Sequence, residues 1–360
     1  MRSTLVTAAV TVTIAVLALA GLAVPAHAQY SSNNLTINGY SSFEFEKQIS
    51  EEGNGDPNGS FDADLFDIVV NFQVTDAIRT SADLTWEHGA ATEDGRGNVA
   101  VEYAFVEYAF NDLFKVRVGK MFTPFGIYNE IHTAKPAFLT VKEPASTNKT
   151  ERILSNGFRY FPRWGAGIAV RGDGLIRDHN FSYDVFVSNG DQDVTNPFEE
   201  DNNVEKAVTA RFRFEPTDSL EIGNSFYYDK RTADSVDHIT SYGLELRYQT
   251  RSWRLLAESA FGWLTPLDGP AVLQVGWYVQ PSYEFRNGVS PYVRFEWLDS
   301  NRDTPDDQGY DLIVGVNYEV SPGFMLKLEN NKYWGGSASS LAQFPGRGYN
   351  EVKAAVVLGF

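Results

Sequence analysis

A cluster of basic side chains lies in residues 123–163, a stretch of the sequence without regular alternation. It holds six lysines and arginines against three acids, although the 360-residue chain carries a formal net charge of −17. Such side chains act through their electric field, which a narrow passage with low-dielectric walls concentrates on passing ions. Rings of Arg and Lys favour anions, whereas Asp and Glu favour cations. The bases of this stretch are Lys135, Lys142, Lys149, Arg152, Arg159 and Arg163.

More bases lie in the alternating segments on either side of this stretch, where we expect them on the polar face. They are Lys115, Arg117, Arg171, Arg211 and Arg213. Together with the first group they would give a passage a modest preference for anions. The alternative is that these bases pair with acids of the same face and leave little net field. The candidate acids are Asp83, Glu87, Glu102, Glu215, Glu245 and Glu258.

Polar and apolar residues alternate through most of the chain after residue 34. In residues 66–75, for example, Phe66, Ile68 and Val70 share one face, and Asp67 and Asn71 share the other. This period predicts β-strands with one apolar and one polar face. Sixteen such segments, most of nine to twelve residues, start near Leu35, Asp64, Ile78, Val99, Phe114, Trp164, Asn180, Lys206, Leu220, Ile239, Trp253, Val272, Val289, Tyr310, Phe324 and Asn350.

The connections between these segments alternate between short turns and long polar loops. Strands of about ten residues, even in number and joined in this way, predict an all-β fold, a 16-stranded antiparallel transmembrane β-barrel. A soluble β-sandwich is the alternative, although its strands would be nearer five or six residues. Residues 123–163 form the third long loop, which starts at the turn Pro124, Phe125 and Gly126. Irregular backbone of that length is tolerated inside a barrel lumen.

The N-terminus has the pattern of a secretory signal peptide. Arg2 precedes a long uncharged apolar run, and small residues at Ala26 and Ala28 fit a cleavage site. We expect residues 1–28 to be removed and residues 29–360 to form the barrel. An uncleaved membrane anchor is the alternative, because the run is long enough to span a bilayer.

Other functional classes find little support in the sequence. The chain has no cysteine, and its acidic balance disfavours nucleic-acid binding. The histidines are scattered, and no G-x-S-x-G or Walker A pattern occurs. Asp299, Asn301 and Asp303 are spaced like the start of a calcium loop, but Thr304 and Tyr310 replace its Gly and Glu. We therefore expect no enzyme activity, metal or cofactor, and acidic loops that meet lipopolysaccharide.

Aromatic residues lie where the predicted strands meet their connections. Side chains of this kind form girdles at the two interfaces of a membrane barrel, and we expect that role here. The alternative is that they are ordinary aromatics at strand ends. They are Phe110, Phe114, Phe122, Trp164, Tyr227, Tyr228, Trp253, Trp263, Trp297, Tyr333 and Trp334.

Two short motifs resemble those of bacterial outer-membrane barrels. The chain ends in the alternating segment NEVKAAVVLGF, whose final Phe360 resembles the signal read by the barrel-assembly machinery. The segment FKVRVGKMFTPFGIYNE is similar to the strand and turn that enter the third loop in Gram-negative porins of the phosphate-selective O and P group. The resemblance implies sixteen strands in the outer membrane, an inward-folded third loop and a homotrimer.

The function expected from these observations is passive diffusion of small hydrophilic solutes and ions through a porin. Residues 123–163 would constrict the pore and supply part of its charge. A barrel plugged by the same loop, acting as a receptor or structural protein, is the alternative from another class. An outer-membrane hydrolase is a third, because a Ser/His pair can assemble in space without a sequence motif.

Overall fold

The described part of the chain is almost entirely β-sheet. The computed structural model describes residues 34–50, 58–87, 99–148, 158–190, 201, 203–231, 236–339, 341 and 348–360. The gaps between them lie in the predicted long connections, and the predicted signal peptide lies outside the described residues. The barrel belongs to one compact unit, Thr36–Phe360. None of the helices in the described residues reaches the length and apolar character needed to cross a membrane.

Sixteen strands and three short helical segments make up the described chain. The helical segments are η1 (Asn129–Ile131), η2 (Lys135–Ala137) and α2 (Ala145–Asn148). The strands are β1 (Leu35–Ser50), β2 (Ser60–Gln73), β3 (Ile78–Glu87), β4 (Ala100–Asn111), β5 (Phe114–Phe122), β6 (Trp164–Ile176), β7 (His179–Ser188), β8 (Ala207–Thr217), β9 (Leu220–Lys230), β10 (Val236–Gln249), β11 (Trp253–Pro266), β12 (Val272–Tyr283), β13 (Val289–Asp299), β14 (Gln308–Ser321), β15 (Phe324–Gly335) and β16 (Tyr349–Gly359).

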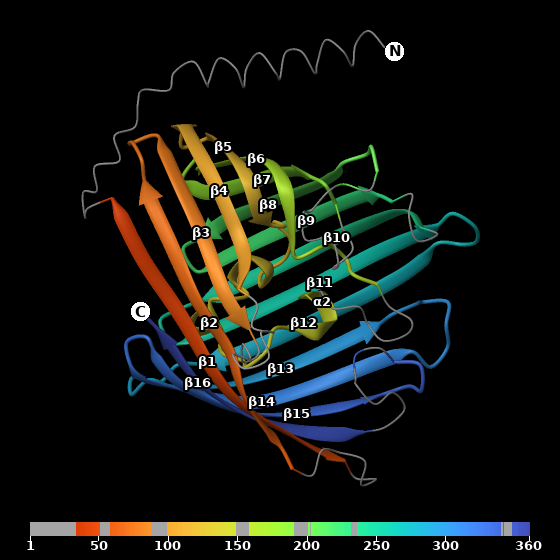
Figure 1. The fold of residues 1–360 in the computed structure, drawn as a ribbon. Coiled ribbons are helices and arrows are strands. Elements are labelled where there is room, and N and C mark those ends of the chain that lie inside the picture. Colours follow the sequence, from red (N-terminus) through yellow and green to blue (C-terminus); the bar gives the residue numbers. More distant parts are fainter. Residues whose placement is uncertain are drawn as a thin grey trace. The chain divides into compact units, whose positions relative to one another are not determined.

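The sheet closes on itself, as the sequence predicted. Each strand pairs antiparallel with its neighbours in sequence, and β1 pairs with β16 in the register Phe43 to Val356. Figure 1 shows the ring of strands running from β1 in red to β16 in dark blue beside it. Gly39 and Phe360 exchange two backbone hydrogen bonds of 2.9 and 3.0 Å at the seam. Closure matters because it gives every strand two partners and leaves no open edge.

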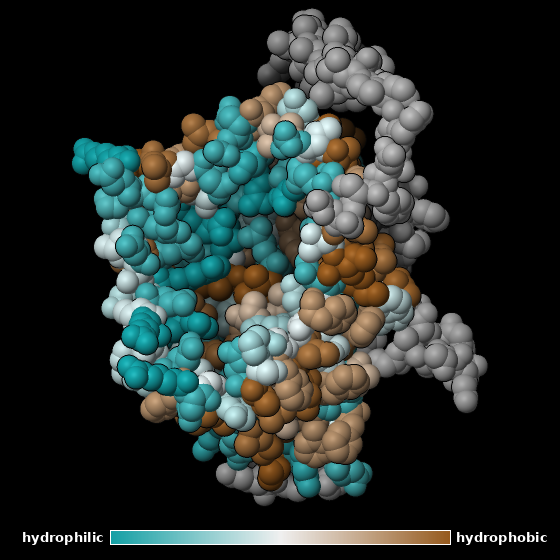
Figure 2. Space-filling model, turned by 90° about the vertical axis from the view of Figure 1, so that its left-hand side faces the viewer, coloured by the Kyte–Doolittle hydropathy of each residue, from teal (hydrophilic) through white to brown (hydrophobic). Residues whose placement is uncertain are grey.

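The two faces of the sheet differ in polarity because the side chains alternate. On β14 the outward Val314 is 53% exposed, whereas Ile313 and Asp311 beside it are buried. Large apolar side chains are exposed on most strands, and charged ones such as Glu44 and Arg294 are buried on the opposite, polar face. Figure 2 shows a hollow in one face lined largely by hydrophilic residues. An apolar outside and a polar inside are what a water-filled membrane barrel requires.

The predicted strand positions are confirmed, with three displaced starts. Thirteen strands start within one residue of the predicted position, but β2, β10 and β14 start four, three and two residues earlier. Alternation does not mark the added residues of β10 and β14. In β2, residues 61–64 alternate, but the phase of the pattern changes at Leu65. The early part of β10, for example, pairs with the end of β11 through an irregular register at Val236 and His238.

Of the aromatic residues predicted to form a girdle, some lie on the exposed apolar face that a girdle requires, and two do not. Phe110, Trp164 and Trp253 are exposed on the apolar face. Tyr227 and Tyr333 are instead buried, since each shares its face with polar neighbours two residues away. Their position at a strand end was the sequence signal, and it does not decide the face.

The apolar outer belt predicts a depth-dependent cost for charge. Val314 lies in the middle of β14 and Val320 on the same face near its end, 53% and 44% exposed. We expect Val314→Arg to lower the free energy of unfolding in lipid vesicles by about 2–4 kcal/mol and Val320→Arg by about 0–1 kcal/mol. Denaturant titration of vesicle-inserted protein measures both. Equal losses in the two variants would contradict a lipid-facing belt.

Candidate functional site

The irregular stretch Thr123–Arg163 lies between β5 and β6, as predicted, and its two ends are tied together. Thr123 N donates to the carbonyl oxygen of Arg163 at 2.9 Å. The Asn129 side-chain amide donates to the carbonyl oxygens of both Thr123 and Arg163, each at 2.8 Å. We call residues 123–163 the third loop. The buried amide of Asn129 therefore holds the two ends of this loop together.

The loop begins at Pro124, Phe125 and Gly126, where the sequence predicted a turn, and Gly126 closely approaches the sheet. Gly126 has a φ of +69°, and a Cβ atom there would lie 2.2 Å from Glu258 Oε1. Only glycine meets both demands without strain. Phe125 is fully buried, and its ring stacks on that of Phe161 at 4.4 Å between centroids. The turn thus starts a small hydrophobic core between the loop and the sheet.

Charged side chains of the polar face bind the backbone of the loop. On β15, the Lys327 ammonium donates to the carbonyl oxygens of Lys135, Phe138 and Thr140 at 2.8, 2.6 and 3.1 Å. Glu329, two residues on, accepts a hydrogen bond from the Val141 amide at 2.9 Å.

The same arrangement recurs on β13 and β11. The Arg294 guanidinium donates to Thr140 Oγ1 and to the carbonyl oxygens of Lys142 and Glu143, at 3.0–3.2 Å. Glu296 accepts from the Ser146 amide at 2.9 Å, and on β11 Glu258 accepts from the Ile127 amide at 3.3 Å. We call Glu258, Arg294, Glu296, Lys327 and Glu329 the anchor side chains.

Four of the five anchor side chains were not among the predicted site residues, and Glu258 was predicted only as an acid that pairs with bases. A signal for them exists in the sequence. Arg294 and Glu296, and likewise Lys327 and Glu329, repeat a base-x-acid pattern on the polar face of two strands. That pattern places a donor and an acceptor side by side, which suits an irregular backbone that needs both.

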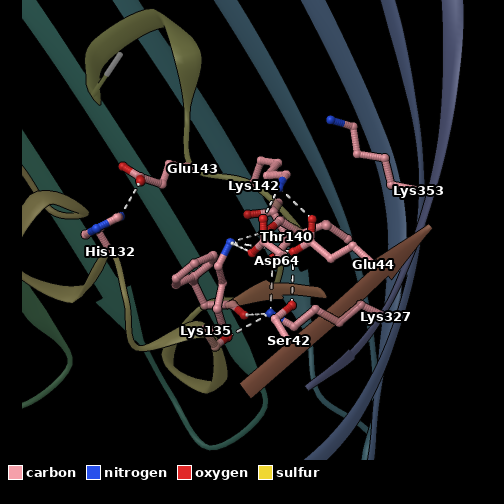
Figure 3. A network of polar contacts seen from close by, with 12 residues as sticks. Ser42, Glu44, Asp64, His132, Lys135, Thr140, Lys142, Glu143, Lys327 and Lys353 are labelled. Carbon is pink, nitrogen blue, oxygen red and sulfur yellow. Dashed lines mark hydrogen bonds and ion pairs between the residues drawn. The ribbon is translucent and has the colours of Figure 1, made fainter. Parts of the chain in front are cut away.

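Two predicted bases of the loop pair with acids of the first two strands. Lys135 lies 3.0 Å from Asp64 and 3.6 Å from Glu44, and Lys142 lies 2.6 Å from each of the two acids. Figure 3 shows both lysines converging on Glu44 and Asp64, with Lys327 close by. Breaking such a buried group from one side costs about 3–5 kcal/mol, because it leaves an uncompensated charge.

The predicted bases on the strands form a second group, which we call the arginine row. Arg117 pairs with Glu107 at 2.8 Å, Arg171 with Asp184 at 3.2 Å and Lys115 with Asp173 at 2.8 Å. Arg211 pairs with Glu245 at 2.5 Å and with Glu130 of the loop at 2.6 Å. Arg213 lies 3.9 Å from Asp184.

The predicted bases therefore fall into two places rather than one. Lys135 and Lys142 lie with β1 and β2, whereas the arginine row spans β5–β8. Arg163 pairs with Glu143 inside the loop at 3.0 Å, and Arg159 is half-buried near the loop's end. Lys149 and Arg152 lie outside the described residues. Of the acids predicted to pair with the bases, Glu245 pairs with Arg211. Asp83 instead accepts a hydrogen bond from Thr133, and Glu102 lies within ion-pair distance of His132.

Two arginines that the prediction did not include extend the row, and their side chains are more exposed than those of its other members. Arg79 on β3 shares Glu107 with Arg117, and its side chain is 43% exposed. Arg247 on β10 pairs with Glu221 and is 32% exposed. Alternation on the polar face was the available signal for both.

His132 links the loop to β4. Its Nδ1 lies 3.0 Å from Glu143 and its Nε2 lies 3.4 Å from Glu102. Burial and the charge of Arg163 would each lower the pKa of His132, but the hydrogen bonds to the two carboxylates raise it above its ordinary value. Burial would raise the pKa of Glu143, but Arg163 and His132 outweigh it and lower that pKa to about 2.

The possible calcium loop has no metal geometry. Asp299 pairs with Arg302 at 3.0 Å, and the Asn301 side chain accepts from the Asp303 amide at 3.1 Å. Across the described ranges, no group of three or more His, Cys, Asp or Glu side chains is arranged to hold a metal ion.

Comparison with known proteins shows which solved structures share this fold. No family model matches the sequence. An uncharacterised protein of Aquifex aeolicus is 25% identical over 254 residues, which are 65% of this chain and 54% of the relative. The chain thus spans about half the length of the curated relative that it matches.

Three solved outer-membrane proteins share the architecture. The anion-selective porin from Comamonas acidovorans superposes with a TM-score of 0.67 at 9% identity, covering 91% of this chain and 99% of the porin. OmpF of Salmonella typhi, in complex with daunomycin, gives 0.63 at 12% identity over 92% and 99%. OmpT of Vibrio cholerae in its trimer form gives 0.56 at 13% identity over 91% and 100%. At these identities the likeness shows a porin-like barrel fold.

Removal of one anchor side chain should loosen the loop. Lys327→Met leaves three loop carbonyl groups without their donor, and each buried unpaired group costs about 1–3 kcal/mol. We expect faster amide hydrogen exchange in residues 135–141. Lys332→Met is the matched control, because Lys332 is exposed on the same strand. Unchanged exchange in Lys327→Met would show that the anchor is dispensable.

The raised pKa of His132 predicts a pH-dependent contribution to stability. Asp67, Asp83 and Glu102 of the sheet face this ring, together with Glu143 and Arg163 of the loop. A histidine whose folded pKa lies above its unfolded value of 6.5 stabilises the fold at low pH, and the gain is lost as the pH rises through the folded value.

We therefore expect His132→Gln to lower the melting temperature more at about pH 6 than at about pH 9. Thermal unfolding followed by circular dichroism measures the difference. His179→Gln is the control, since His179 has no carboxylate partner within the described residues. A difference that is constant across this pH range would contradict protonation of His132 in the folded protein.

Proposed function

We propose that the chain is an outer-membrane porin, a passive channel for small hydrophilic solutes and ions, with no enzymatic step. The main observation behind this proposal is that the loop covers one part of the polar face and leaves another part uncovered. The third loop covers the anchor side chains of β11, β13 and β15, while Arg79 and Arg247 of the arginine row are partly exposed, at 43% and 32%. A water path along the arginine row, narrowed by the loop inside the lumen, fits this division.

The likeness to porins supports the remaining parts of the proposal. We propose export by the signal peptide 1–28, residence of residues 29–360 in the outer membrane amid lipid and lipopolysaccharide, and insertion by the barrel-assembly machinery. Phe360, 58% exposed at the seam, is the proposed assembly signal. The name of the Vibrio OmpT structure, a trimer form, supports a homotrimer for this chain too.

Ion pairing limits the proposed charge selectivity. Eight of the predicted bases have a carboxylate partner, so their fields are largely cancelled at a distance. A modest anion preference would rest on Arg79 and Arg247, which also have carboxylate partners but are partly exposed to water. The name of the Comamonas porin supports the same sign, whereas the net charge of −17 opposes it.

Reversal potentials across planar bilayers in a KCl gradient test both channel and filter. We expect multi-state conductance from wild type, and a shift towards cations when Arg79 and Arg247 are both changed to Gln. Lys135→Gln is the control, because Lys135 belongs to the loop and its side chain is buried. Equal shifts in both variants would contradict a path along the arginine row.

The plugged barrel keeps one observation in its favour, the buried aromatic core between loop and sheet around Phe125 and Phe161. Liposome swelling separates the two functions. Sugar permeation through wild type supports the porin, whereas permeation only after deletion of residues 126–160 would establish the plug.

A further inference from the structure

A small cavity lies beneath the third loop, apart from the two charge groups described above. Its volume is about 190 Å³. Residues 136–139, around η2, cover one side, and the ends of β10–β15 nearest the short turns form the other. Outer-membrane barrels have short periplasmic turns, so in the proposed porin these turns lie at the periplasmic mouth. The cavity is therefore a recess in the wall of the proposed channel.

The cavity contains a base without a partner. Arg254 of β11 lines it, half-buried, in register with Gln249 of β10 and Ser282 of β12. In the described part of the chain no carboxylate lies within 4.0 Å of this guanidinium, unlike the paired members of the arginine row. A planar guanidinium of this kind binds a carboxylate through two parallel hydrogen bonds.

An unsatisfied acceptor also lines the cavity. Asn317 of β14 is 5% exposed, and its Oδ1 has no hydrogen-bond donor within the described residues. Its Nδ2 reaches only the sulfur of Met325, at 3.9 Å. A buried amide oxygen without a donor costs free energy, so the site favours a ligand or water that donates to it.

The rim of the cavity is acidic, and its covering is apolar. Glu284 and Glu319 are exposed at the rim, and neither forms an ion pair with any described residue. Phe138 and Leu139 of the loop are buried on the covering side. The recess thus presents one guanidinium for an anion, amide and carboxylate oxygens for a cation, and an apolar surface on the side of the loop.

The volume restricts the ligand. Drug-sized ligands occupy pockets of about 300–1,000 Å³, so a cavity of 190 Å³ suits a smaller molecule. It would hold about six waters at about 30 Å³ each. A molecule with a carboxylate and an ammonium group a few bonds apart meets both the size and the charge pattern.

We propose that this recess binds free α-amino acids with small apolar side chains, the carboxylate on Arg254 and the ammonium on Asn317 Oδ1 and the rim acids. The inference rests on the proposed channel function and deepens it by naming a solute class that binds beside the water path. Residues 136–139 would contact the ligand side chain, so the loop backbone held by Lys327 also shapes this recess.

Isothermal titration calorimetry of the full chain in detergent tests the proposal with three matched probes. L-alanine carries both charged groups, propionate lacks the ammonium, and ethylamine lacks the carboxylate. We expect alanine to bind at least about tenfold more tightly than either partial probe, because two interactions act together. Arg254→Gln should weaken alanine binding about tenfold, and Arg254→Lys should restore part of it.

Arg251→Gln is the matched control, since Arg251 is exposed in the adjacent turn and does not line the recess. Propionate binding as tightly as alanine would overturn the zwitterion assignment, as would alanine binding that Arg254→Gln leaves unchanged. Absence of alanine binding would also overturn it.

Conductance distinguishes this inference from the proposed function. Alanine binding without single-channel conductance would support the recess and refute the porin. Conductance without alanine binding would keep the porin and refute the recess.

Discussion

Every part of this structure depends on one constraint, the pairing of backbone N–H and C=O groups where no water reaches them. Behind an apolar belt, an unpaired strand edge would leave backbone groups without partners, so the sheet must close. The pairing of β1 with β16 closes it. The third loop cannot join the sheet, so its backbone needs other partners. Charged side chains provide them: Lys327 and Arg294 donate to its carbonyl oxygens, and Glu296 and Glu329 accept from its amides.

Using charges in this way has consequences for function. Charges that hold the loop are buried and paired, and they add little to the field that a passing ion meets. The arginine row remains on the other side, where exposed members such as Arg79 can meet water. In the proposed channel, therefore, one half of the polar face supports the loop and the other half faces the solute. Arg254 is an exception to this pairing within the described residues, and the proposed ligand site depends on that exception.

Much of the fold follows from the sequence because each strand of the barrel shows a local alternation of polar and apolar residues. Sixteen strands, their order and the bounds of the third loop are all read from period-two patterns and turn residues. The early start of β10 carries no such pattern, and in β2 the pattern changes phase at Leu65. Tyr227 and Tyr333 show the same limit, since a strand-end position does not decide which face an aromatic occupies.

The site was less predictable because it depends on contacts between distant segments. Sequence spacing could place Lys135 and Lys142 in the loop. It could not show that they pair with Glu44 and Asp64, which lie roughly 70 to 100 residues earlier in the chain. The anchors were missed for the same reason. Arg294 looks like any polar-face base until the loop backbone is seen beside it. Pairing, and not the count of bases, decides how much charge is left for a solute.

The central claim is that the third loop covers one side of the polar face and leaves the other to water. The chain has no cysteine, so single cysteines introduce unique labels. Thiol modification during single-channel recording should be fast and reduce the current for Arg247→Cys, whose side chain is 32% exposed. It should be absent for Ile313→Cys, which is fully buried against Leu139 of the loop. Equal modification at the two positions would contradict the account.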